Sequence, residues 1–188
     1  MNALLSRFLI VGERLMIATR VAINGVELEL KRFPEKHDKS LQAWDSGDEY
    51  LLETVIPDIA PEHRIAIIND SFGTLTCFLA EFAPVTSTDS FVAQKATRLN
   101  LKRNGLDDEA VTFNYANEAL EDKFDWVLIK VPKTLSLLTH QLNQVAPHLS
   151  TNSKIVAVGK VKDIHKSTLS LFEKIFGKTT TSLAKKKS

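Results

Sequence analysis

The stretch from Ile65 to Phe82 holds the residues best placed to bind a cofactor. Its first four residues are apolar and predict a buried parallel strand, which a polar turn and a helix follow. Turns of this kind hold a dinucleotide or S-adenosylmethionine when two or three glycines let the backbone approach the ligand and present helix N-terminal amides. Here Ser71 and Phe72 occupy the turn, and only Gly73 remains. The pattern is typical of a cofactor fold that has lost its cofactor.

Charged residues at the predicted strand ends are the second candidate site, because ligands of parallel sheets bind there. Asp89 ends the second buried strand, where it suits a ribose hydroxyl pair, and it suits equally well the N-cap of the next helix. Four lysines at adjacent strand ends are expected to converge on one rim, where they either meet an anion or remain solvated. They are Lys130, Lys133, Lys160 and Lys162.

A basic helix, expected over residues 91–104, is the third candidate. Lys95, Arg98 and Lys102 follow three- and four-residue steps and share one face, with Arg103 beside them. This face could follow a phosphate backbone, or it could be an ordinary solvated helix face. The apolar residues of the same helix are expected to turn inward: Phe91, Val92, Ala93, Ala96 and Leu99.

Metal and hydrolase chemistry have no support in the sequence. The five histidines show no i, i+4 pairing and have no acidic or thiol partner at metal-ligand spacing, so we expect no metal. No G-x-S-x-G elbow is present. The single cysteine, Cys77, is expected to be a small buried apolar side chain.

Composition indicates one ordinary soluble domain located in the cytoplasm. The chain has 188 residues, of which 44% are hydrophobic and 25% charged, and it has one cysteine and no pattern for secretion or a membrane. The net charge of +1 hides an asymmetry, because residues 1–90 carry a balance of −6 and residues 91–188 a balance of +7. The second half could therefore meet phosphate. Met16 could be the natural start, which would make residues 1–15 an extension.

The chain alternates between strand and helix patterns, which predicts an α/β fold with a doubly wound, mostly parallel sheet covered on both faces. Residues 1–24 are treated as an N-terminal extension and 25–188 as one domain. Expected strands cover 25–32, 65–68, 85–90, 111–117, 125–131, 154–161 and 179–186. One helix is expected to begin with Ser46 as its N-cap. Further helices are expected over 74–82, 91–104, 134–149 and 167–176.

Several segments carry a family resemblance: LQAWDSGDEYLL, INDSFGTLTCFLAE, RLNLKRNGL, VLIKVPKTLSLL and KDIHKSTLSLFEKIFG. From about Leu30 onward the chain resembles the N-terminal domain of the RlmG-type ribosomal RNA guanine-N2 methyltransferases, relatives of the RsmC type. The resemblance implies a Rossmann-like class I methyltransferase fold with a degenerate cofactor loop. In that family two such domains share one chain, and only the C-terminal one keeps the S-adenosylmethionine loop and the Asn-Pro-Pro-Phe motif.

The resemblance also assigns positions in this sequence. Asp89 falls on the ribose-binding acid, and Lys130 to Lys133 fall on the Asn-Pro-Pro-Phe position. The vestigial cofactor loop comprises Asn69, Asp70, Ser71, Phe72 and Gly73, followed by Thr74.

The resemblance implies a non-catalytic domain that binds and positions large-subunit ribosomal RNA. Its partner would be its own C-terminal catalytic domain, which this chain lacks and which would bind S-adenosylmethionine. No residue here is assigned as catalytic, and no cofactor is expected on this domain. Two alternatives stay open. One is an active methyltransferase domain with an atypical loop that uses Asp70 and Asp89, and the other is a purely structural partner domain.

Overall fold

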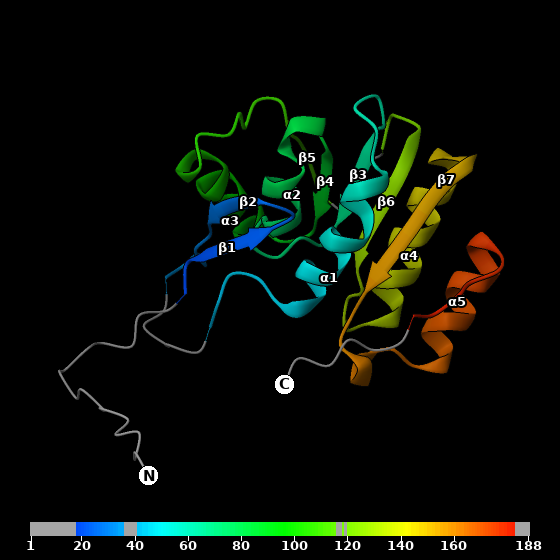
Figure 1. Cartoon of the computed structure of the whole chain (residues 1–188). Helices are drawn as coiled ribbons and strands as arrows, with labels where there is room; N and C mark the ends of the chain where they lie inside the picture. The colour runs from blue at the N-terminus through cyan, green and yellow to red at the C-terminus, as the bar shows by residue number, and fades with distance from the viewer. Residues whose placement is uncertain (1–17, 36–40, 116–117, 119, 183–188) are drawn as a thin grey trace, which may run out of the picture.

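A five-stranded parallel sheet organises the molecule (Figure 1). The structure is a computed structural model that describes residues 18–35, 41–115, 118 and 120–182. The strand order is β5-β4-β3-β6-β7. In chain order the strands are β3 (Ile65–Ile68), β4 (Val85–Thr88), β5 (Thr112–Tyr115), β6 (Phe124–Lys130) and β7 (Leu149–Val158). Because the chain proceeds from β3 to β5 in one direction and then returns to place β6 against β3, the topological switch point lies between β3 and β6.

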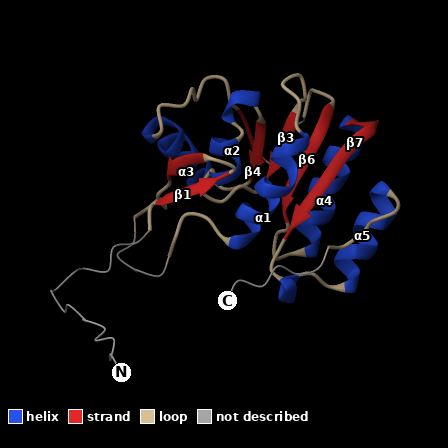
Figure 2. Ribbon diagram, viewed as in Figure 1, coloured by secondary structure: helices blue, strands red, loops and turns tan. Residues whose placement is uncertain are grey.

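Helices cover both faces of this sheet, so the doubly wound α/β fold predicted from the sequence is confirmed (Figure 2). One face carries α1 (Ser46–Val55), α2 (Thr74–Phe78) and α3 (Phe91–Arg103). The other face carries α4 (Leu135–Val145) and α5 (Lys166–Phe176). Short 3₁₀ turns follow α1, α2 and α4 and precede α5.

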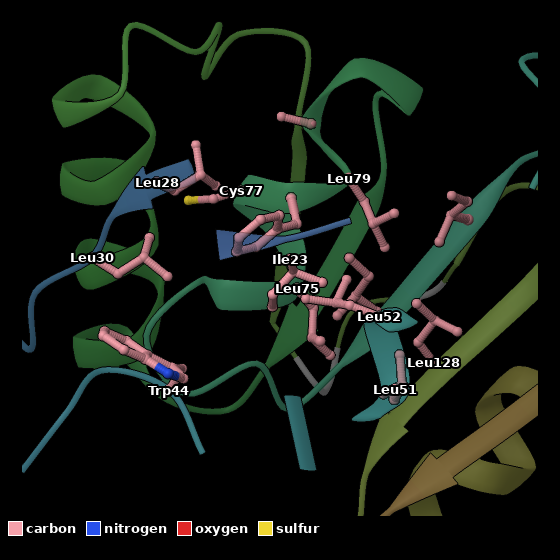
Figure 3. Packing of buried hydrophobic residues seen from close by; sticks show 14 of the residues in the cluster. Ile23, Leu28, Leu30, Trp44, Leu51, Leu52, Leu75, Cys77, Leu79 and Leu128 are labelled. Atoms are coloured by element: carbon pink, nitrogen blue, oxygen red, sulfur yellow. The ribbon is translucent and has the colours of Figure 1, made fainter. Parts of the chain in front are cut away.

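The buried strands supply both cores because successive side chains point to opposite faces of the sheet. Ile65 and Ile67 pack with the cluster under α1 and α2, whereas Ala66 and Ile68 pack with the cluster under α4 and α5. Figure 3 shows the first cluster, in which Leu51 and Leu52 of α1, Leu128 of β6 and Trp44 belong to the same core. A strand buried on both faces explains the uninterrupted apolar run at 65–68.

An antiparallel hairpin, β1 (Arg20–Ile23) and β2 (Val26–Glu29), precedes the sheet. Asn24 and Gly25 form its two-residue turn with φ of 48° and 82°, the left-handed geometry that matches strand twist. The alternating pattern predicted a strand over 25–32 but did not reveal β1, whose Val21 and Ile23 lie in the first core cluster. The expected domain boundary at residue 25 falls within this hairpin.

Side chains of α3 form hydrogen bonds with the backbone of β2 and of the segment after it, and so hold both against the helix. The Asn104 side chain accepts from the Glu29 amide at 2.8 Å and donates to the Glu29 carbonyl at 2.8 Å. The Asn100 side chain does the same for Lys31, at 3.0 and 2.9 Å. The two asparagines thus take the place of a neighbouring strand and draw residues 29–33 along α3.

Three local expectations were wrong. Asp45, not Ser46, is the N-cap of α1, because its carboxylate accepts from the Gly47 and Asp48 amides while Asp48 bonds back to Asp45. Ser90, not Asp89, caps α3 through the Ala93 amide at 3.2 Å. The strand expected over 179–186 is absent from residues 179–182, and the rest of it lies outside the described residues.

Candidate functional site

The turn after β3 is closed by its own aspartate. Asp70 is 3% exposed, and its carboxylate accepts from the Gly73 amide at 3.2 Å, the Thr76 amide at 2.9 Å and the Thr76 hydroxyl at 2.9 Å. These amides belong to the start of α2, where a glycine-rich loop would present N–H groups to an anionic ligand. Because Asp70 accepts from two of them, they are not free to bind the carboxylate end of a cofactor.

Gly73 keeps this turn tight for a packing reason. Its φ is +83°, and a Cβ at this position would come within 2.6 Å of Thr97 Cα on α3. The Asn100 amide also holds the Phe72 carbonyl at 2.8 Å, while the Arg32 guanidinium lies 4.5 Å from the centre of the Phe72 ring. Gly73 therefore allows the turn to pack closely against α3. The half-buried ring of Phe72, with the Arg32 guanidinium over it, occupies the turn. Ser71 is exposed.

An ion cluster lies on the α1 side of the crevice at the switch point, where the ends of β3 and β6 meet. Lys130 ends β6, and its ammonium lies 2.5 Å from Asp48 Oδ1 and 3.2 Å from Asp45 Oδ2. The Lys130 side chain is 16% exposed and that of Asp48 only 2%. Lys130 thus ties the end of β6 to the first turn of α1, and its charge is compensated inside the protein.

Burial controls the ionisation of this cluster. It raises the pKa of Asp48 to about 7, because loss of solvent outweighs the attraction of Lys130. It likewise raises the pKa of Asp70, against the hydrogen bonds from Thr76. For Lys130, burial acts to lower the pKa, but the facing charges of Asp48 and Asp45 outweigh it and raise the pKa above its ordinary value.

An amide pair closes the α4 side of the same switch point. Asn69, directly after β3, adopts a φ of 65° and donates from Nδ2 to the Lys130 carbonyl at 3.0 Å and to Gln141 Oε1 at 2.8 Å. Gln141 of α4, 3% exposed, returns a bond from Nε2 to Asn69 Oδ1 at 2.8 Å. The ends of β3 and β6 are therefore bridged by side chains. Gln141 was not predicted as a site residue, because it lies 72 residues from its partner Asn69 in the sequence.

A cavity of about 350 Å³ remains beside these groups, under the segment before α1. Trp44, Phe72, Asp45, Lys130 and Lys160 are among the residues that line it. It is the space left at the switch point once Lys130 and Asp48 have paired. The residues present do not fit the needs of S-adenosylmethionine, because the amides of the turn and the charged groups of Asp48, Asp70 and Lys130 are already partnered within the protein.

The four rim lysines are not equivalent. Lys130 is held in the ion cluster, whereas Lys133, Lys160 and Lys162 are exposed, and Lys160 lines the same cavity as Lys130. Lys130 and Lys160 therefore lie at the same edge, beside one cavity. The expectation that all four ammonium groups are available to an anion does not fit the burial of Lys130.

The outward face of α3 differs from expectation in its apolar residues. Ala93 and Ala96 are buried as expected, but Phe91 is 63% exposed, Val92 43% and Leu99 39%. The cations share this face. Lys95 lies 4.9 Å from the centre of the Phe33 ring, Arg98 lies 3.6 Å from Asp108 and 3.9 Å from the Phe113 ring, and Lys102 is exposed. Arg103 donates to Asn100 Oδ1 on its own helix.

The remaining candidates are an exposed carboxylate and a buried thiol. Asp89 is exposed at the end of β4, where no hydrogen bond fixes its carboxylate among the described interactions. Cys77 is buried as expected, and burial raises the pKa of its thiol. Within the described part of the chain, no three histidine, cysteine or acidic side chains gather closely enough to bind a metal, and no helix has the length and apolar character to span a membrane.

A comparison with protein families covers most of the chain. Residues 18–188 match the model of the RLMG N-terminal domain. The chain belongs to this family. Relatives of this RLMG N-terminal domain include "Ribosomal RNA large subunit methyltransferase G" of Klebsiella pneumoniae, 46% identical over 171 residues, and that of Yersinia enterocolitica, 41% identical over 171 residues. The matches cover 90% of this chain but 45% and 43% of those proteins, so the chain spans about half the length of the relatives it matches.

Solved structures agree with the RLMG N-terminal domain in fold. A putative S-adenosylmethionine-dependent methyltransferase from Streptococcus mutans superposes with a TM-score of 0.64 at 14% identity, covering 88% of this chain and 48% of that one. A putative methyltransferase complexed with S-adenosylhomocysteine gives a TM-score of 0.63 at 13% identity, covering 89% of this chain and 49% of that one. These likenesses establish the Rossmann-like methyltransferase fold that the sequence resemblance implied.

Proposed function

We propose that this domain binds and positions large-subunit ribosomal RNA for a catalytic domain of the same protein and does not itself transfer a methyl group. The observation that carries the proposal is the closed switch point. Lys130, Asp48 and the Asn69–Gln141 pair bridge the crevice where relatives of this fold place their ligands. Asp70 accepts from the amides of the turn, so the turn no longer offers these amides to a cofactor.

The relatives support the RNA part of the proposal. They bear the name of a ribosomal RNA methyltransferase, and this chain matches less than half of each. A domain without its own cofactor site can still raise the rate of its partner by supplying binding energy that orients the substrate. The excess of cations in residues 91–188 suits a polyanion, and the exposed lysines Lys133, Lys160 and Lys162 supply positive charge at the strand ends.

The cavity beside Lys130 is the observation that favours a second candidate function, binding of S-adenosylmethionine by an atypical loop. In that case Asp70 and Asp89 would contact the cofactor, and Asp70 would have to release Thr76 first. Direct titration with the cofactor separates the two functions.

Charge reversal tests the RNA function. We expect Lys160→Glu with Lys162→Glu to weaken binding of a large-subunit rRNA fragment and to lower the log-log salt slope by about 0.7 to 0.9 for each phosphate that the variant no longer neutralises. The matched control is Lys174→Glu with Lys178→Glu, which reverses two exposed lysines on and just after α5 and should do much less. Equal weakening by both pairs would indicate diffuse attraction without a site. Lys130 is left intact, because its ammonium is paired with Asp45 and Asp48 within the protein.

A further inference from the structure

Helix α3 presents an outward face that mixes cations with exposed apolar side chains and carries no acidic residue. Its thirteen residues include four cations and no Asp or Glu. At 100° per residue, Arg98, Phe91, Lys102, Lys95, Leu99 and Val92 fall on one continuous arc, and the buried residues occupy the rest of the helix. Three exposed apolar side chains, Phe91, Val92 and Leu99, are thus grouped on the cationic side of this helix, and grouped exposed apolar side chains mark interaction sites more often than single ones do.

The first two turns of this face form a patch that we call the Phe91 patch: Phe33, Phe91, Val92 and Lys95. Phe91 precedes Lys95 by four residues, so both side chains lie on the same side of the helix. Phe33 reaches Lys95 because Asn100 and Asn104 hold residues 29–31 along α3, and the next residues continue toward the helix N-terminus. The Lys95 ammonium thus lies over the Phe33 ring, and Phe91 lies one helical turn before Lys95 on the same side of α3.

The far half of α3 has a different environment. Arg98 is paired with Asp108 of the acidic loop after α3, so its charge is partly neutralised. Lys95 has no carboxylate partner among the described ion pairs. A lysine without a carboxylate partner among the described ion pairs and the exposed ring of Phe91 therefore lie together in the Phe91 patch, at the carboxyl edge of β4.

We infer that the Phe91 patch binds an unpaired nucleotide, with a base stacked on the Phe91 ring and Lys95 against the adjoining phosphate. The inference rests on the proposed RNA function and specifies its substrate class as single-stranded RNA. Aromatic rings accept any base by its π-face, and a neighbouring cation holds the backbone. A duplex cannot use this patch in the same way, because its bases are already stacked on one another.

The test compares a labelled single-stranded RNA oligonucleotide with a duplex of the same sequence at low salt. Phe91→Ala should weaken binding of the single strand at least about fivefold, which corresponds to the lower end of base stacking energies, and leave duplex binding unchanged. It should not alter the salt slope, because the variant keeps every cation. Lys95→Ala should instead lower the slope by about 0.7 on the single strand.

Two further variants keep the result interpretable. Phe91→Trp should retain or tighten binding of the single strand, since tryptophan offers a larger stacking surface. Val26→Ala removes an apolar side chain that is 51% exposed on the β1–β2 hairpin, which contacts the opposite end of α3 from Phe91, and it should have no effect.

The outcomes separate the two proposals. If RNA binds and Phe91→Ala behaves as wild type, or weakens single strand and duplex equally, the stacking inference is overturned while the RNA function stands. If neither RNA binds at low salt, both fail.

Discussion

Replacement of Lys130 by methionine tests the ion cluster through the pH dependence of stability. In the wild-type fold the pKa of Asp48 is raised from 3.8 to about 7. Between these values the folded chain binds more protons than the unfolded chain, so stability falls as pH rises. The fall is about 1.4 kcal/mol per pH unit, or about 4 kcal/mol in total for this group, and it stops once Asp48 is ionised in both states, above about pH 7.

Lys130→Met removes the charge that favours ionised Asp48. The pKa of Asp48 must then rise further, so the variant keeps its proton beyond pH 7 and goes on losing about 1.4 kcal/mol per pH unit where the wild type has levelled off. The stability difference between the two proteins should therefore grow by about 1 to 3 kcal/mol between about pH 5 and about pH 8 to 9. Lys130 itself does not titrate in this window, because its pKa is raised above its ordinary value of 10.5.

Urea unfolding at about pH 5 to 9, followed by the fluorescence of buried Trp44 and Trp126, measures these free energies. Lys133→Met is the matched control, because Lys133 is exposed and three residues away. Asp48→Asn should flatten the wild-type fall between about pH 4 and 7. Parallel stability curves for wild type and Lys130→Met between about pH 7 and 9 would refute the reasoning.

Two further predictions concern the turn after β3. Asp70→Ala should cost about 1 to 3 kcal/mol of unfolding free energy, because the buried amides of Gly73 and Thr76 lose their acceptor. Asp89→Ala, at an exposed position, should change the unfolding free energy by no more than about 0.5 kcal/mol. Urea midpoints at constant m-value measure both effects, and equal effects would contradict the role given to Asp70. Gly73→Ala should destabilise more than Gly105→Ala: both have positive φ and lose about 1 to 2 kcal/mol from that alone, but only the Cβ at 73 meets backbone, at 2.6 Å from Thr97 Cα. Thermal unfolding of the two variants compares them, and similar melting temperatures would show that the turn relaxes freely.

The sequence predicted the parallel sheet well because its central strands are strongly constrained. Ile65 to Ile68 is buried on both faces, so a run of four apolar residues corresponds directly to β3. Gly105, with a φ of +65°, follows the end of α3 as its residue type predicts. Such features can be predicted from a short stretch of sequence, because they do not depend on contacts with residues far away in the chain.

The candidate site was less predictable because its contacts join residues far apart in the chain. Lys130 meets Asp48 across 82 residues, and Asn69 meets Gln141 across 72. A lysine at a strand end predicts an exposed cation unless the facing carboxylate is known. Phe91 was expected to turn inward because it is apolar, but it lies four residues before Lys95, on the cationic side of α3, and stays 63% exposed. The degenerate turn, by contrast, was visible in the residue types at 69–73.

Titration calorimetry of the chain with S-adenosylmethionine shows whether the side chains at the switch point between β3 and β6 exclude a cofactor. We expect no heat beyond dilution at cofactor concentrations up to the millimolar range, because Asp70, Lys130 and Asn69 are already engaged by partners within the protein. A saturable isotherm with micromolar affinity would contradict it and establish this domain as a cofactor-binding methyltransferase domain.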